Sequence, residues 1–150
     1  MAITTSEVEA FFAAYGKRSD DALHDPPVED VDGVVASFAP YFVGASPKGV
    51  LGGANDAAFR DAVPKGFARY RAIGGTAMTV TAVDVTLFDE WSAMARVGWR
   101  FAYTRPGDGT SGTIAFANHY FLNKADGHLR IFAYVTPDEE GAMREHGLIP

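Results

Sequence analysis

The sequence predicts an α+β domain in which N-terminal helices close a strongly curved antiparallel sheet into a pocket. Apolar residues recur at helical spacing in the first half of the chain and alternate with a period of two from Thr76 onward. Helices followed by a run of strands are typical of an α+β fold with the helices on one face of the sheet. A chain of 150 residues that is 47% hydrophobic fits one core, so a single domain over residues 1–150 is expected.

Three helical segments are expected in the first half, each opened by a polar residue that caps the helix. Ser6 and Glu9 match the S-x-x-E capping box, and Pro64 is expected to kink or split the third segment. Residues 44–53 are interpreted as a loop. The helical segments run from about Ser6 to Asp20, from Asp30 until Pro40, and from Asn55 or Asp56 to Gly74.

The second half is expected to form a largely antiparallel sheet. Asp126-Gly127 is a strong hairpin signal between the last two strands. Thr136 as N-cap and Pro137 at the first helical position predict a short C-terminal helix that ends at Gly147. The expected strands lie between Thr76 and Leu87, between Ala93 and Tyr103, and over Thr113–Asn123 and Leu129–Thr136.

Composition excludes several classes of protein. The formal charge of −6 comes with no basic cluster, so the phosphate neutralisation that gives nucleic-acid affinity is missing. No apolar run approaches the roughly 20 residues of a membrane span, and the N-terminus lacks the pattern of a secretory signal. The absence of cysteine suits a reducing compartment. We therefore expect a cytoplasmic protein with no nucleic-acid or membrane partner.

Familiar catalytic and metal motifs are missing or lack their context. Residues 107–112 match G-x-G-x-x-G, but a strand rather than a helix follows, so a hairpin loop is expected there. Ser46 lies outside a G-x-S-x-G nucleophile elbow and is interpreted as part of a loop. The 4 histidines show neither H-x-H nor H-E-x-x-H spacing. Neither a metal nor a cofactor is expected.

Two residues in apolar surroundings are candidates for chemistry. Tyr15 belongs to the apolar stripe of the first helix, and either buries its ring with the hydroxyl at the rim or directs the hydroxyl into a pocket. His119 is the only ionisable group on its strand face, and is either a satisfied core histidine or a general acid or base. Arg96 and Arg100 lie opposite Trp99 on their strand and are interpreted as solvated or dimer-rim residues.

The strand expected at residues 113–123 is largely apolar on both faces. One alternating set contains Ala117 and Phe121, and the other contains Phe116 and Leu122. Because helices cover only one face of such a sheet, the second apolar face predicts a partner subunit, most simply in a two-fold homodimer.

The order of elements resembles that of the nuclear transport factor 2-like superfamily. The segments that carry the resemblance are V-E-A-F-F-A-A-Y, D-V-D-G-V-V-A-S-F-A-P and Y-F-L-N-K-A-D-G-H-L-R-I-F-A-Y. The chain looks most similar to the SnoaL-like and ketosteroid-isomerase-like branch. The resemblance implies a cone-shaped, curved antiparallel sheet with N-terminal helices packed on its concave face. In the ketosteroid isomerases, a tyrosine and a protonated aspartate hold an enolate while another aspartate moves the proton.

The resemblance also implies site residues. Tyr15 matches the tyrosine, His119 falls where the strand aspartate stands, and the base position falls near Ser46, which has no useful basicity. Asn118 and Tyr120 are placed on the outer, subunit-facing surface. The implied cavity suits an apolar or aromatic small molecule. Its expected lining is Trp99, Phe101, Ala117, Phe121, Phe132, Tyr134 and Thr136.

Two functions stay open at this point. The first is a SnoaL-like small-molecule pocket protein that acts as a lyase, isomerase or cyclase on an apolar carbonyl-bearing substrate, with Tyr15 as donor and His119 as acid or base. The alternative is a noncatalytic ligand-binding or dimerisation domain, which the missing base favours.

Overall fold

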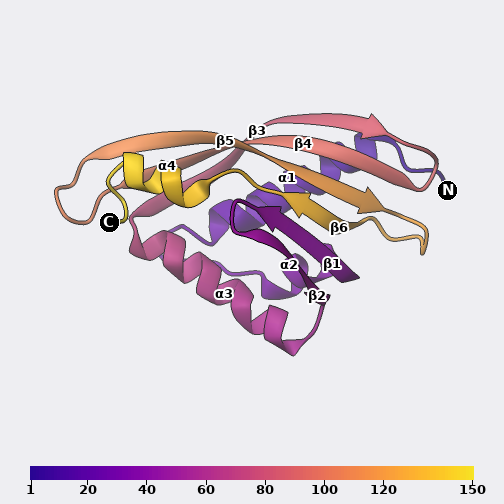
Figure 1. Ribbon diagram of the computed structural model, residues 1–150, viewed down its shortest axis with the longest axis horizontal. Helices are drawn as coiled ribbons and strands as arrows, with labels where there is room; N and C mark the ends of the chain where they lie inside the picture. Colours follow the sequence, from indigo (N-terminus) through magenta and orange to yellow (C-terminus); the bar gives the residue numbers. More distant parts are fainter.

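The computed structural model describes residues 1–150 and contains helices together with one six-stranded sheet (Figure 1). In chain order the elements are α1 (Thr5–Asp21), α2 (Val31–Ala36), β1 (Phe38–Ser46), β2 (Gly49–Ala54), α3 (Ala57–Ala72), β3 (Gly75–Leu87), β4 (Ser92–Thr104), β5 (Ser111–Asn123), β6 (Arg130–Val135) and α4 (Glu139–Glu145). None of these helices is both long enough and apolar enough to span a membrane.

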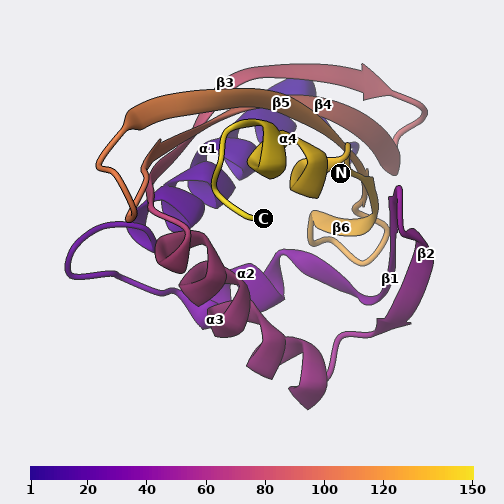
Figure 2. The same ribbon diagram turned by 60° about the vertical axis from the view of Figure 1, so that its left-hand side comes forward.

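The sheet has the order β2-β1-β6-β5-β4-β3. Its neighbouring strands are antiparallel except for β1 and β6, which run parallel, so the sheet is mixed. It curls without closing, and α1, α3 and α4 lie on its inner side (Figure 2). The α+β prediction and the cone-shaped fold are therefore confirmed, with one parallel pair that the sequence pattern did not indicate.

Apolar alternation places the core on the concave face. Val97 of β4, Leu122 of β5 and Ile131 of β6 are fully buried beneath Val8 and Phe12 of α1. Burying side chains of this size is worth roughly 1.5–3 kcal/mol each before the entropy cost of ordering them. The helix and the sheet thus hold each other in place through one apolar layer.

Close packing of α1 on the sheet depends on Gly16. A Cβ at this position would lie 2.6 Å from Cγ2 of Val80 on β3, so only glycine leaves room for the strand. Because Tyr15 is the neighbouring residue, this contact also fixes how far the Tyr15 ring stands from the sheet.

Helix starts differ from the predictions by one or two residues. Asp30 and Asp56 cap α2 and α3 as expected, and each accepts a hydrogen bond from a backbone N–H of its helix. Thr4, rather than Ser6, caps α1 and pairs with Glu7. Asp138, rather than Thr136, caps α4. Each segment offers more than one residue that can cap, and tertiary contacts choose between them.

The prediction of a loop over residues 44–53 is wrong, because these residues form most of the β-hairpin that consists of β1 and β2. Their glycines and exposed side chains hide the strand pattern in the sequence. Pro40 lies within β1, where the register with β6 is irregular and no ladder donor is required. Helix α3 also continues through Pro64 rather than splitting there.

Candidate functional site

A cavity of about 430 Å³ lies between the concave face of the sheet and helices α1, α3 and α4. This volume falls in the range of small-molecule sites, and 14 of the 20 lining residues are hydrophobic. Aromatic rings dominate the wall: Tyr15, Phe67, Tyr70, Trp99, Phe101, Phe116 and Tyr120. The cavity wall is therefore mainly apolar and aromatic.

Some of the residues that the sequence proposed for the site border this cavity. They are Tyr15, Trp99, Phe101, Ala117 and Thr136. Tyr134 borders a second cavity of about 240 Å³ beside the β1–β2 hairpin, together with Ser46 and Thr136. The Ser46 hydroxyl accepts a hydrogen bond from the Lys48 backbone N–H, as in a turn.

The predicted orientation of β5 is wrong. His119 pairs with the exposed Arg96 of β4, whereas Asn118 pairs with the buried Val97 and Tyr120 with Ala95. Cross-strand partners share a face of the sheet, so His119 lies on the convex face and Tyr120 on the concave face. A shift of one residue moves every side chain of a strand to the other face. Tyr15 and His119 consequently do not share the cavity.

Phe121 and Phe132 are also placed on the convex side. Their ring centroids are 6.2 Å apart, and neither borders the cavity. The placement of Phe121 follows from the orientation of β5. The placement of Phe132 follows from a register shift between β5 and β6, because this shift leaves Phe132 without a paired residue while Tyr134 pairs with Tyr120. A bulge of this kind redirects a side chain locally.

Tyr15 borders the cavity, and its hydroxyl forms no hydrogen bond with the protein. Its ring is held by aromatic neighbours, with centroid distances of 5.9 Å to Phe12, 6.1 Å to Trp99 and 5.9 Å to Tyr120. Burial raises the pKa of the Tyr15 phenol well above its usual value of about 10. The phenol therefore stays neutral and can donate a hydrogen bond to a ligand.

A polar cluster lies beside Tyr15 on the cavity wall. The Tyr120 hydroxyl oxygen accepts hydrogen bonds from Trp99 Nε1 at 3.2 Å and from Asn118 Nδ2 at 3.0 Å. Asn118 Oδ1 is buried and has no partner. Reversing the amide would give the Tyr120 hydrogen an acceptor and leave Nδ2 unpaired instead. In either orientation, one polar atom of Asn118 lacks a protein partner next to the cavity.

Carboxylates border the cavity at α4. Glu139 accepts a hydrogen bond from the Tyr70 hydroxyl. The pKa of this phenol is raised, mainly by burial and secondly by the negative charge of Glu139. Asp138 accepts from the backbone N–H of Gly141 as the cap of α4. Glu140 points away from the cavity to Lys48 and Arg69. No lysine, arginine or histidine is among the lining residues.

Sequence reasoning missed the polar residues of this wall. Tyr70 and Glu139 are 69 positions apart and meet only through the packing of α3 against α4, so no local pattern indicates the pair. The prediction that Asn118 lies on the outer surface is wrong, because the hairpin closes at Thr104 and Ser111 and so pairs Asn118 with the buried Val97.

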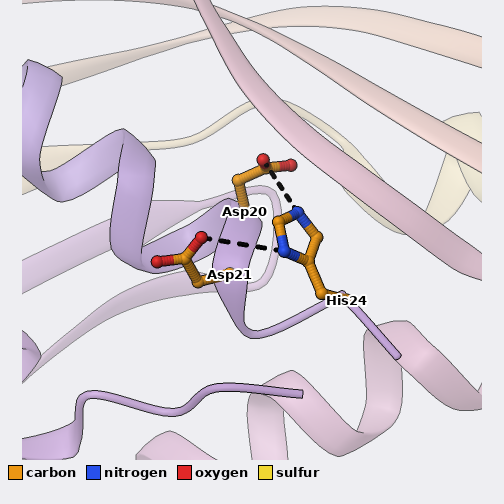
Figure 3. Close-up of side chains that lie close together, drawn as sticks. All are labelled: Asp20, Asp21 and His24. Atoms are coloured by element: carbon orange, nitrogen blue, oxygen red, sulfur yellow. Dashed lines mark hydrogen bonds and ion pairs between the residues drawn. The ribbon is translucent and has the colours of Figure 1, made fainter. Parts of the chain in front are cut away.

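One group of potential metal ligands occurs at the end of α1, where Asp20, Asp21 and His24 lie close together (Figure 3). Asp20 accepts hydrogen bonds from the Met78 backbone N–H and from His24, at 2.9 and 3.1 Å. Asp21 forms an ion pair with Lys17. These contacts explain the group as a connection between α1 and β3, and none of its residues borders the main cavity.

The curled sheet, its helical cover and the aromatic cavity between them define a protein of the nuclear transport factor 2-like class. Within that class, residues 6–139 match the family of NTF2-like proteins designated DUF6841, so the chain belongs to this family. The resemblance drawn from the sequence segments is thereby confirmed. Comparison with curated proteins finds no match.

Solved structures with the same fold span nearly the whole chain. An NTF2-like protein with a cystatin-like fold from Novosphingobium aromaticivorans has a TM-score of 0.64 and 18% identity, and the match covers 97% of this chain and 88% of that one. Aln2 from a Streptomyces species has a TM-score of 0.63 and 18% identity over 97% and 99% of the two chains. A ketosteroid isomerase-like protein from Erwinia carotovora atroseptica has a TM-score of 0.58 and 17% identity, with 88% and 90% covered.

Proposed function

We propose that the cavity binds an apolar small molecule that carries an acceptor oxygen, such as a carbonyl, and that Tyr15 donates a hydrogen bond to this oxygen. The observation that carries the proposal is Tyr15, which borders the cavity and whose neutral hydroxyl has no protein partner. A phenol hydroxyl without a protein partner on a largely apolar wall is free to donate to a ligand oxygen. The aromatic wall supplies apolar contact for the rest of the ligand.

A pair of ring compounds tests this proposal. Acetylnaphthalene carries a ketone oxygen, and ethylnaphthalene of the same substitution pattern does not. We expect the ratio of their dissociation constants, measured by titration calorimetry, to shift against the ketone by about three- to tenfold in Tyr15→Phe, as for the loss of one neutral hydrogen bond. Tyr41→Phe is the matched control, because Tyr41 is 72% exposed on β1. An unchanged ratio in Tyr15→Phe contradicts the role of Tyr15.

A second candidate function is catalysis on the same carbonyl group, as a lyase, isomerase or cyclase. The presence of the Tyr15 donor and two carboxylates in the lining of the same cavity favours it, since proton transfer requires an acid or base beside the ligand. With His119 on the convex face, that group has to be Asp138 or Glu139. Incubation with a metabolite extract, followed by mass spectrometry of bound and released species, separates the two functions. A chemically altered ligand demonstrates turnover, whereas recovery of the unaltered ligand supports binding alone.

We also propose that the convex face of the sheet joins two copies of the chain. Phe88 and Phe121 stack there with ring centroids 6.5 Å apart, and Phe88, Phe132 and Val135 are 56%, 37% and 43% exposed. Exposed apolar residues that adjoin one another are typical of an interface. Light scattering at micromolar concentration should give twice the chain mass, and Phe121→Asp should give the single mass. A native protein of single-chain mass contradicts this proposal.

A further inference from the structure

The charges around the cavity have a single sign. Asp138 and Glu139 border it, and no cationic side chain does. Asp138 is occupied as the cap of α4, whereas Glu139 has no ion pair. The only side-chain hydrogen bond of Glu139 comes from Tyr70, which is a neutral donor. Glu139 is therefore a carboxylate beside an aromatic wall that forms no ion pair, although Lys48 and Arg69 line the second cavity, which Glu139 also borders.

The arginines that precede the lining residues Ser19 and Tyr70 in the chain form ion pairs with other carboxylates. Arg69 on α3 pairs with Glu140 at 3.4 Å rather than with Glu139. Arg18 on α1 pairs with Asp30 at 3.4 Å and donates to the Ser37 hydroxyl at 3.2 Å. Glu139 is half-buried and borders the main cavity, and no cationic side chain lines that cavity, so a positively charged ligand group there would meet the carboxylate without a competing cation on the wall.

The aromatic wall adds to the same preference. Tyr70, the donor to Glu139, lies 5.7 Å from Phe101 between ring centroids, so the carboxylate adjoins the ring cluster. The faces of aromatic rings carry negative electrostatic potential and attract ammonium groups within about 6 Å. The same rings and carboxylates repel an anionic ligand, and no lining residue compensates for that repulsion.

We propose that the ligand of this cavity is a cationic amine, with an apolar ring system among the aromatic residues and its ammonium group beside Glu139. This inference rests on the proposed function, because it names the chemical class of the molecule that the same cavity takes. Tyr15 and Glu139 then recognise different parts of one ligand, an acceptor oxygen and a protonated nitrogen.

Three probes of one ring system and nearly equal size test the inference in the native protein. Naphthylmethylamine is cationic at neutral pH, naphthylmethanol is neutral and naphthoate is anionic. We expect the amine to bind about tenfold more tightly than the alcohol, and the carboxylate to bind most weakly. This ranking, measured by titration calorimetry, requires no variant. If the alcohol binds as tightly as the amine, the inference is wrong while the proposed cavity function stands. If none of the three binds, the proposed function itself fails.

Two variants of α4 identify the carboxylate. Glu139→Gln keeps the shape of the side chain and is expected to reduce the advantage of the amine over the alcohol to less than about twofold. Glu145→Gln is the matched control, because Glu145 is an exposed residue of the same helix, away from the cavity, and its loss changes the net charge equally. Binding of the alcohol reports whether Glu139→Gln is folded. An amine advantage that survives in Glu139→Gln, or disappears in Glu145→Gln, overturns the assignment to Glu139.

Discussion

The two faces of β5 have similar amino-acid compositions and opposite roles. On the concave face, Ile114, Tyr120 and Leu122 are 8%, 4% and 0% exposed, whereas no residue of the convex set is buried. The concave face also holds the hydrogen-bonded cluster of Trp99, Tyr120 and Asn118. Apolar character alone therefore does not tell which face of a strand forms the core. Pairing with the neighbouring strand decides it.

The largest expected difference between the faces is in stability. Leu122→Ala should lower the free energy of unfolding by about 2–5 kcal/mol, because it opens a void in a fully packed layer. Phe121→Ala removes a larger side chain from the convex face and should cost only about 1 kcal/mol. Urea denaturation at two protein concentrations measures both and separates any contribution from association. Equal losses would mean that the faces are not distinct.

A smaller effect is expected from the polar cluster of the concave face. Tyr120→Phe keeps the ring but removes the hydroxyl that accepts from Trp99 and Asn118. We expect a loss of about 1–3 kcal/mol in the free energy of unfolding, because two buried donors lose their partner. Tyr41→Phe, on an exposed ring of β1, should change stability little by comparison. Chemical denaturation of the two variants in parallel checks this, and equal losses would argue against the cluster.

Alkaline pH probes the phenols of the concave face. Burial raises the pKa of Tyr15 and Tyr120, so at high pH the folded protein holds protons that the unfolded chain releases. This contribution to stability is fully present below about pH 10 and is lost as the pH rises further, by about 1 kcal/mol for Tyr15 between pH 10 and 11. Denaturation midpoints across this range should fall less steeply in Tyr15→Phe. An identical slope in native and variant protein contradicts the raised pKa of Tyr15.

Much of the fold could be predicted because local signals agreed with the packing. The caps Asp30 and Asp56, the Asp126-Gly127 turn and the alternation of β4 each depend on neighbouring residues in the chain. The β1–β2 hairpin could not be predicted in this way. Its exposed glycines and apolar residues, such as Val50 and Leu51, follow neither periodicity, and pairing with β6 holds it in the sheet.

The candidate site was predicted only in part, for a related reason. Tyr15 could be found because its helical stripe has a single apolar face. His119 and Asn118 could not be distinguished by hydrophobicity, since both alternating sets of β5 are apolar. Counting outward from the closing pair Thr104–Ser111 pairs Val97 with Asn118. Counting from Tyr103 and Thr113, the strand ends expected from the sequence, pairs Val97 with His119 instead, so the orientation depends on a loop length that the sequence pattern does not fix. The contact of Tyr70 with Glu139 depends on tertiary packing and has no equivalent signal in the sequence.

The smallest expected effect is at His119, and it tests the difference between the two faces of β5 most directly. His119 pairs with Arg96 on the convex face, and its side chain forms no hydrogen bond. His119→Ala should therefore change the free energy of unfolding by no more than about 0.5 kcal/mol, and should leave ketone binding in the cavity unchanged. Asn118→Ala, one position away, should weaken that binding, because it removes a polar group from the cavity wall. Calorimetric titration of acetylnaphthalene into both variants tests the contrast. Weaker binding in His119→Ala with native binding in Asn118→Ala would reverse the orientation of β5 and remove the basis for the proposed site.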